Sequence, residues 1–112
     1  MIRGEIWWVD FGIPFGSEAG YKRPALIVQD DNFNRSQIRT IIVVPFSTNI
    51  VLSDAPGNVL LEKEETGLSK DSVLVCSLIA SVDRSRLVER ISNIDRRVFG
   101  EVEEGIRILL GM

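Results

Sequence analysis

The sequence predicts a small, mainly β domain that ends in one helix, an arrangement that a strongly bent barrel accommodates best. Short segments of strand character recur between residues 2 and 94, separated by turn residues. After Asp95 the apolar residues instead recur at intervals of three and four, which is typical of a helix. The chain has 112 residues, which suffice for one hydrophobic core, so we assign residues 1–112 to a single domain.

The first predicted strand covers residues 2–11 and contains two adjacent tryptophans. Successive side chains of a strand point to opposite faces, so Ile6 and Trp8 share one face while Trp7 and Val9 share the other. Apolar residues on both faces are typical of a strand that is covered on both sides. We therefore expect one indole in the core and the other at an interface.

Glycines and a proline break the pattern over residues 12–20, a segment long enough to be typical of a functional loop. A second strand is predicted over residues 24–29, followed by a cluster of turn residues at 30–37. The third strand, residues 38–47, is nearly all apolar and should be central. We expect Pro45 to end this strand or to form a bulge in it, because proline has no N–H to donate to a neighbouring strand.

The remaining predicted elements follow in order: a loop at 48–58, a strand at 59–62, a turn at 63–71 with a positive φ at Gly67, a strand at 72–79, one helical turn at 83–87, and a last strand at 88–94.

A C-terminal helix is predicted after Asp95, with one apolar stripe on its surface formed by Val98, Val102, Ile106 and Leu109. Asn93 or Asp95 can cap its start and Gly111 its end. Gly100 and Gly105 lie inside the helix, where each costs about 1 kcal/mol relative to alanine. The helix therefore needs tertiary packing.

Composition excludes several classes of protein. Hydrophobic residues make up 45% and charged residues 26%, as in folded globular proteins. The absence of histidine removes Ser-His-Asp triads, Cys-His pairs and histidine-based zinc sites. We interpret Cys76 as a core residue, since a lone thiol forms no internal disulfide.

No segment resembles a signal sequence or a membrane span, so we expect a cytoplasmic protein. The net charge of −3 means that any nucleic acid must bind to a local patch.

Candidate functional residues come from two loops: Ser17, Glu18, Lys22 and Arg23 from the first, and Ser47, Thr48 and Asn49 from the second. If the second and third strands pair in antiparallel fashion, Arg23 lies near Ser47 and Thr48, and an arginine beside hydroxyls is a plausible phosphate site. Two other interpretations remain open. Arg23 could pair with Glu18 or Asp10 and only hold the loop, and the hydroxyls could serve turns alone. The glycine spacing matches no Walker or Rossmann fingerprint.

The ordered set "RGEIWWVDF", "GSEAGYKRPALIV", "VVPFSTN", "PGNVLL", "TGLSKDSV" and "VDRSRLVERI" resembles the MazF/PemK family of toxins from bacterial toxin-antitoxin pairs, over nearly the whole chain. The resemblance implies an SH3-like barrel of the CcdB/PemK type and a homodimer. It also implies a metal-independent endoribonuclease, without a cofactor, that cuts single-stranded RNA at short sequences. A cognate antitoxin, with a disordered tail over the RNA groove, would restrain it.

By the same resemblance, Arg23 contacts the scissile phosphate and Glu18 lies in the same groove. Ser47 occupies the place of a family threonine, and Thr48 is next to it, so either hydroxyl could serve. Ser17, Lys22 and Asn49 would bind RNA.

Near residues 78 and 80 relatives often carry glutamine and arginine, whereas this chain has Leu78 and Ala80. This departure affects base contacts more than the reaction.

The implied reaction is attack of a ribose 2′-hydroxyl on the adjacent phosphorus, leaving 2′,3′-cyclic phosphate and 5′-hydroxyl ends. Arg23 would stabilise the charge on the phosphoryl oxygens. Either Glu18 is the base, or electrostatics and positioning supply most of the rate. Two alternatives come from other classes of protein: a non-catalytic gyrase poison like CcdB on the same barrel, and a plain SH3-like binding module.

Overall fold

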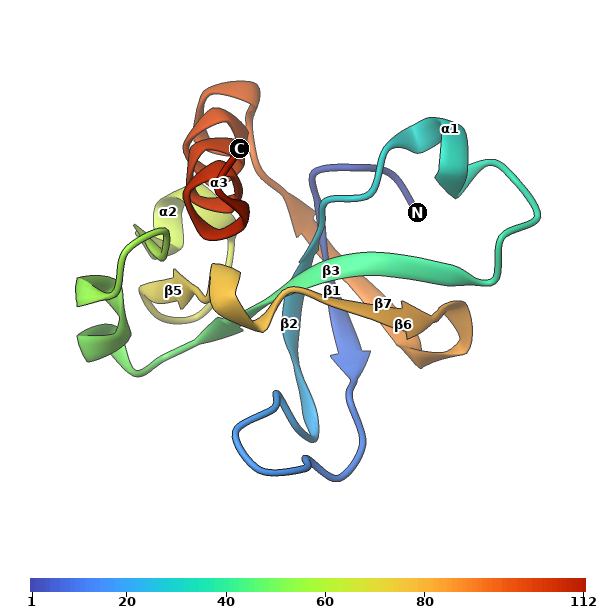
Figure 1. Ribbon diagram of the computed structural model, residues 1–112, viewed down its shortest axis with the longest axis horizontal. Helices are drawn as coiled ribbons and strands as arrows, with labels where there is room; N and C mark the ends of the chain where they lie inside the picture. Colours follow the sequence, from blue (N-terminus) through green and yellow to red (C-terminus); the bar gives the residue numbers. More distant parts are fainter.

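The computed structural model describes residues 1–112 as a bent antiparallel sheet of seven strands, with the longest helix at one side (Figure 1). Mainly β architecture with a C-terminal helix is therefore confirmed. The strands are β1 (Glu5–Asp10), β2 (Lys22–Ile27), β3 (Thr40–Ser47), β4 (Val59–Leu61), β5 (Ser72–Leu74), β6 (Ala80–Asp83) and β7 (Leu87–Asn93). The helices are α1 (Asp31–Asn34), α2 (Lys63–Thr66) and α3 (Arg96–Leu110), and 3-10 turns cover Ile50–Asp54, Cys76–Leu78 and Arg84–Arg86.

The sheet has the order β4-β5-β3-β2-β1-β7, and β6 also pairs with β3. All pairs are antiparallel. Strand β3 is central, as predicted, because β2 occupies one of its edges while β6 and β5 share the other. The pairing of β1 with β7 joins the first strand to the last, Glu5 lying opposite Asn93.

The expectation that Pro45 ends or bulges the third strand is wrong, because β3 continues to Ser47. Pro45 lies opposite Ala25 of β2, and its carbonyl accepts a hydrogen bond from the Val75 N–H at 3.0 Å. In an antiparallel strand the carbonyl and nitrogen of one residue point to the same side. The missing N–H would therefore point to the edge of β3 at the place where the partner on that edge changes from β6 to β5. No hydrogen bond between paired strands is lost there.

The same exchange of partners explains a second difference. Residues 72–79 were predicted as one strand, but the chain forms β5, a 3-10 turn over Cys76–Leu78, and then β6. The turn carries the chain from the Ser47 end of β3 toward its Thr40 end. An apolar run alone does not reveal such a break, because both short strands and the turn between them contribute buried side chains.

Two shorter elements lie within predicted loops. The turn cluster at 30–37 contains α1, which begins where the Asp30 carboxylate accepts from the Asn32 N–H at 2.9 Å. The loop at 48–58 contains the 3-10 turn Ile50–Asp54. Two finer predictions are confirmed: Gly67 has a φ of 75° where it ends α2, and one helical turn covers Arg84–Arg86.

Hydrophobic clusters cover both faces of the β1-β2-β3 sheet. Ile6 belongs to the larger cluster, which packs against α3, and Val9 belongs to a smaller cluster on the opposite face. Trp7 packs against the smaller cluster and is half-buried, while Trp8 is 39% exposed on the face of Ile6. The two-sided covering of the first strand is confirmed, although neither indole is fully enclosed.

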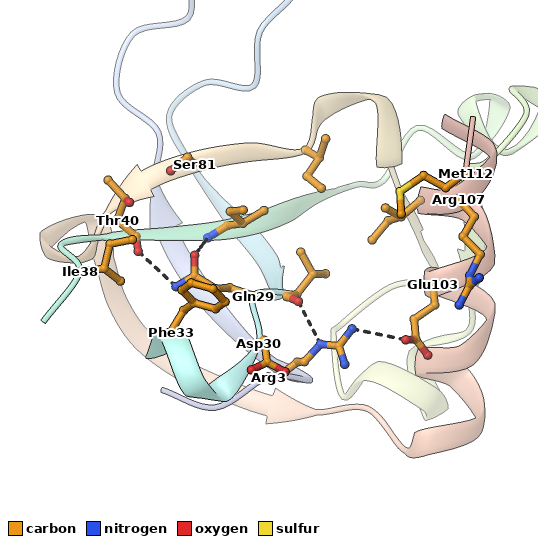
Figure 2. Close-up of a pocket in the computed structure, with 14 residues that line it drawn as sticks. Arg3, Gln29, Asp30, Phe33, Ile38, Thr40, Ser81, Glu103, Arg107 and Met112 are labelled. Atoms are coloured by element: carbon orange, nitrogen blue, oxygen red, sulfur yellow. Dashed lines mark hydrogen bonds and ion pairs between the residues drawn. The ribbon is translucent and has the colours of Figure 1, made fainter. Parts of the chain in front are cut away.

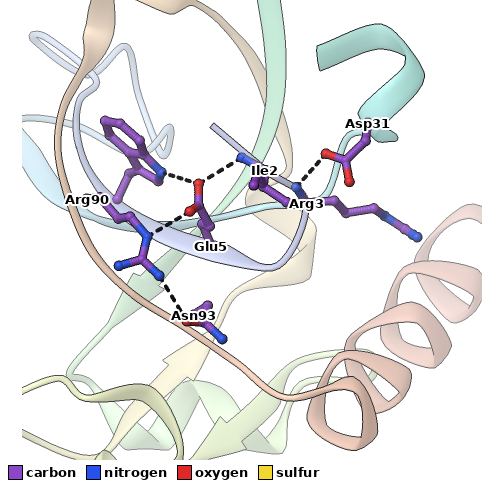
Figure 3. A network of polar contacts seen from close by, with 7 residues as sticks. Ile2, Arg3, Glu5, Asp31, Arg90 and Asn93 are labelled. Atoms are coloured by element: carbon purple, nitrogen blue, oxygen red, sulfur yellow. Dashed lines mark hydrogen bonds and ion pairs between the residues drawn. The ribbon is translucent and has the colours of Figure 1, made fainter. Parts of the chain in front are cut away.

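A polar network ties the beginning of β1 to β7, as Figure 3 shows. The Glu5 carboxylate accepts from the Trp7 indole at 3.1 Å, from Arg90 at 2.7 Å and from the Ile2 N–H at 2.7 Å. Partial burial raises the pKa of Glu5, but these three hydrogen bonds outweigh it, and the pKa lies below its usual value. Glu5 is therefore ionised where the sheet closes.

Helix α3 begins and ends as predicted. The Asp95 carboxylate accepts from the Val98 N–H at 2.9 Å, and Gly111 ends the helix with a φ of 71°. Val98 and Val102 of the apolar stripe are buried, whereas Leu109 is exposed. No helix combines the length and the apolar character that crossing a membrane requires.

Candidate active site

Three strand ends meet at one end of the sheet. The residue pairs of β2 and β3 run from Ile27 opposite Val43 to Ala25 opposite Pro45. Extending this antiparallel register by two residues sets Arg23 opposite Ser47. On its other edge Arg23 lies opposite Val9, near the end of β1. The long loop between β1 and β2 and the loop after β3 therefore leave the sheet side by side.

Arg23 has no carboxylate partner. Its Nε donates to the Gly20 carbonyl at 3.3 Å, and none of the ion pairs of the chain includes it. The Asp10 carboxylate instead accepts from the Gly12 N–H at 2.9 Å. The alternative in which Arg23 pairs with Glu18 or Asp10 is therefore not what the structure shows. A half-buried guanidinium with free donors suits a phosphate or a carboxylate from a partner.

The hydroxyls after β3 are arranged by a turn. Ser47 Oγ accepts from the Asn49 N–H at 3.1 Å, so its oxygen serves the turn while its O–H remains free to donate. Thr48 and Asn49 are exposed. Ser47 and Thr48 both line a cavity of about 280 Å³.

Glu18 lies in a different place from these hydroxyls. Its Oε1 accepts from the Phe15 N–H at 3.1 Å within the β1-β2 loop. It lines a second cavity of about 390 Å³, to which Leu78, Ala80 and Arg86 also contribute. The cavity is therefore of mixed character, because the apolar side chains of Leu78 and Ala80 lie beside charged ones.

The structure thus brings some of the candidate residues together and leaves others apart. Arg23 and Ser47 lie at neighbouring ends of the paired strands β2 and β3, and Lys22 begins the same strand as Arg23. Ser17 is exposed on the β1-β2 loop beside Glu18. Glu18 and Ser47 line two different cavities.

The sequence reasoning missed two residues at the site. Trp8 and Lys70 line the same cavity as Ser47 and Thr48. The alternation of side chains along the first strand already placed Trp8 on the face of Ile6. The sequence could not show, however, that Trp8 is exposed on that face. Lys70 was interpreted only as part of a turn, because its approach to β3 depends on the β3-β5 pairing.

Cys76 has the character of a core residue. It is fully buried beneath α3, and burial raises the pKa of its thiol to about 11. Its thiolate is therefore scarce at neutral pH. No three acidic, cysteine or histidine side chains come close enough to one another to hold a metal ion.

Residues 2–110 match the model of the PemK-like, MazF-like toxins of type II toxin-antitoxin systems. The endoribonuclease MazF6 of Mycobacterium tuberculosis is 34% identical over 112 residues, which cover 100% of this chain and 98% of that protein. The chain belongs to this toxin family.

Solved structures agree with the family. A crystal structure of MazF from Deinococcus radiodurans superposes with a TM-score of 0.82 at 26% identity, covering 100% of this chain and 97% of the other. A MazE-MazF structure from the same organism gives a TM-score of 0.77 at 28% identity, with coverage of 100% and 96%. The barrel expected from the resemblance is thereby confirmed.

Proposed function

We propose that this toxin is a cytoplasmic endoribonuclease that cleaves single-stranded RNA at a short sequence without a metal ion or other cofactor. The observation that carries the proposal is Arg23, a half-buried residue that lacks a carboxylate partner and lies where the extended β2-β3 register sets it opposite Ser47. The identity with a relative named as an endoribonuclease supports it.

In the proposed reaction the ribose 2′-hydroxyl gives up its proton to water as its oxygen attacks the adjacent phosphorus, and the bond from phosphorus to the 5′-oxygen breaks. The products are a 2′,3′-cyclic phosphate and a 5′-hydroxyl end, the leaving oxygen taking up a proton. Arg23 donates to the phosphoryl oxygens, where negative charge develops. The free O–H of Ser47, or that of Thr48, positions the phosphate or the attacking group.

The separation of Glu18 from Ser47 favours a reaction in which positioning and electrostatics supply most of the rate. Glu18 then contributes to the RNA groove, with Ser17, Lys22 and Asn49 as further RNA contacts. A Glu18→Gln variant should keep most of its single-turnover rate. A loss of 100-fold or more, together with loss of the acidic limb of the pH profile, would instead make Glu18 the base.

The first experiment incubates the purified chain in EDTA with a long unstructured RNA and with DNA of matching sequence, and maps the ends produced. We expect cuts in RNA alone, because DNA lacks the 2′-hydroxyl. Arg23→Ala should slow cleavage by about 10²-fold or more. Arg96→Ala, which removes an exposed arginine at the start of α3, is the matched control and should cut normally. Equal activity of the two variants would refute the site.

We propose further that the toxin is a homodimer. Phe33 of α1 is 55% exposed, and Ile38 and Ile42, before and within β3, are 42% and 38% exposed. They border a cavity of about 560 Å³ that also reaches Ile106 and Met112 at the end of the chain (Figure 2). Exposed apolar side chains that gather around a cavity can be covered by a partner, and two copies related by a two-fold axis can bury them.

Analytical ultracentrifugation tests the dimer. The unaltered chain should sediment at twice the mass of one chain, and Ile42→Glu should sediment as a monomer because it places a charge at the centre of the apolar face. Leu60→Glu, which alters a comparably exposed residue of β4 outside this cavity, should remain dimeric. A monomeric unaltered chain would refute this proposal without affecting the reaction.

The second proposed partner is an antitoxin with a disordered acidic or amphipathic tail, whose carboxylates take the place of the phosphate beside Arg23. The MazE-MazF assembly of the Deinococcus relative supports this proposal. The antitoxin encoded with the toxin should inhibit RNA cleavage at equal concentration. Arg23→Glu should weaken that inhibitor's binding, and unchanged binding would refute a tail at this position.

A further inference from the structure

The cavity beside the two candidate hydroxyls contains groups that the proposed reaction does not use. We call it the Trp8 cavity, and its lining includes Trp8, Pro24, Ser47, Thr48, Ser69 and Lys70. It lies beside the middle of β1, the start of β2, the end of β3 and the loop that follows α2. Its volume is about 280 Å³.

The position of Trp8 is unusual for a tryptophan in the middle of a strand. Ile6 and Val9, its neighbours along β1, are both fully buried, whereas Trp8 is 39% exposed. Pro24 lies opposite it on β2 and is half-buried. A partly exposed indole whose cross-strand partner is a rigid proline can stack with a planar group at small cost in side-chain entropy.

The charge of the Trp8 cavity favours an anionic ligand. Lys70 is its only charged lining residue, and Lys70 takes part in no ion pair of the chain. Four hydroxyl-bearing residues line the cavity as well, and Ser72 among them donates to the Lys70 carbonyl at 3.1 Å. Glu89, the cross-strand partner of Trp8, is exposed and lies outside the lining.

We propose that the Trp8 cavity binds one nucleobase of the single-stranded RNA next to the cut bond. The base stacks on the Trp8 indole, its polar edge meets the hydroxyls, and Lys70 contacts the phosphate of the same nucleotide. This inference rests on the proposed ribonuclease function. Stacking on an aromatic side chain with a nearby cation is how proteins hold single-stranded nucleic acid.

The strand geometry supports a base at this position. Arg23 lies on the face of Val9, and Trp8 and Pro24 lie on the opposite face of the same two strands. Ser47 and Thr48 at the end of β3 line the Trp8 cavity, and extending the β2-β3 register sets Ser47 opposite Arg23. An RNA strand whose phosphate meets Arg23 can therefore pass the end of β3 and turn its adjacent base into the cavity. Bases turned out of a stack in this way are those that proteins read in RNA.

The test measures binding separately from cleavage. The cut sequence is first mapped with the unaltered chain, and a short RNA of that sequence is made with a 2′-deoxyribose at the attacking position, so that it binds without reacting. Trp7→Phe leaves Trp8 as the only indole. The emission of Trp8 should be quenched as the RNA is added, because a base stacks on the exposed ring.

Three further variants localise the effect. Trp8→Ala should weaken binding about 5- to 100-fold, and Trp8→Phe should restore most of it, since a phenyl ring still stacks. Lys70→Gln should lower the slope of log affinity against log salt by about 0.7, the value for one phosphate of a single strand. Lys63→Gln removes an equal charge from α2, outside the cavity, and should leave the slope unchanged. Far-ultraviolet circular dichroism confirms that each variant is folded.

The outcomes distinguish the two proposals. Failure of the unaltered chain to cut any RNA refutes the proposed function, and this inference with it. Cutting by the unaltered chain, with no quenching and normal affinity of Trp8→Ala, refutes this inference alone. If Trp8→Ala binds RNA normally but no longer binds the antitoxin, the cavity is a protein-docking site and the inference is wrong. Quenching, loss in Trp8→Ala and recovery in Trp8→Phe support it.

Discussion

Helix α3 contains two glycines whose replacement by alanine should change stability in opposite directions. Gly100 is exposed, and a β-carbon added there would meet no atom within 4 Å. Gly105 is buried, and its β-carbon would lie 2.2 Å from the Gly57 carbonyl oxygen and 3.1 Å from Cys76 Sγ. The two sites share the gain in helix propensity but differ in the space available.

The magnitudes follow from these contacts. Gly100→Ala should stabilise the protein by about 0.5–1 kcal/mol, because alanine loses less backbone entropy than glycine. Gly105→Ala brings the same gain, but the contact is with backbone and cannot be relieved by a rotamer change. Overpacking costs about 1–3 kcal/mol, and a contact this short should reach the upper end of that range. The net loss for Gly105→Ala is then about 2 kcal/mol.

Urea denaturation followed by circular dichroism, at equal chain concentration, measures both changes. The free energies of unfolding of the two variants should differ by about 2–3 kcal/mol, or by about 8–12 °C in midpoint temperature for a chain of this size. If Gly105→Ala is as stable as the unaltered protein, the close approach of α3 to the loop at Gly57 is not a determinant of the fold.

Three further predictions concern other sites. Cys76, with a pKa of about 11, should react with a thiol reagent at pH 7 at least 100-fold more slowly in the folded protein than in denaturant, and rapid labelling would contradict its burial. The pKa of Glu5 is lowered in the folded protein, so the stabilisation it provides is complete above about pH 4.5 and is lost as the pH falls below that value. Urea titrations from pH 6 to 3 should show a shallower acid loss for Glu5→Gln, and parallel curves would contradict the network. Asp95→Ala removes the cap of α3 and should cost about 1 kcal/mol in the same urea assay, whereas Asp54→Ala at the end of a 3-10 turn should cost less than half of that.

Much of the fold followed from local patterns. The helix after Asp95 was predictable because its cap, its apolar stripe and its terminal glycine lie within one short segment. The division of residues 72–79 was not predictable, since it depends on Pro45, which is distant in sequence and marks where β3 changes partners. Local sequence patterns therefore predict individual helices and strands, whereas the break within residues 72–79 depends on which strands pair.

The candidate site likewise has some features that the sequence predicts and others that only the pairing of distant strands explains. The neighbourhood of Arg23 and Ser47 could be expected because consecutive strands tend to pair. The contribution of Lys70 could not, because it reaches the site through the pairing of β3 with β5. The absence of a carboxylate beside Arg23 also depended on the path of the loop, which turns Asp10 toward Gly12.

The pairing of β1 with β7 has a consequence for how the toxin is made. A ribosome synthesises β1 first, yet the partner of its outer edge is not complete until Asn93, and α3 follows still later. Until then the edge of β1 and the larger core cluster lack their partners. The nascent chain therefore cannot assemble the complete barrel before β7 and α3 have been made, and active toxin should appear only after that point of synthesis.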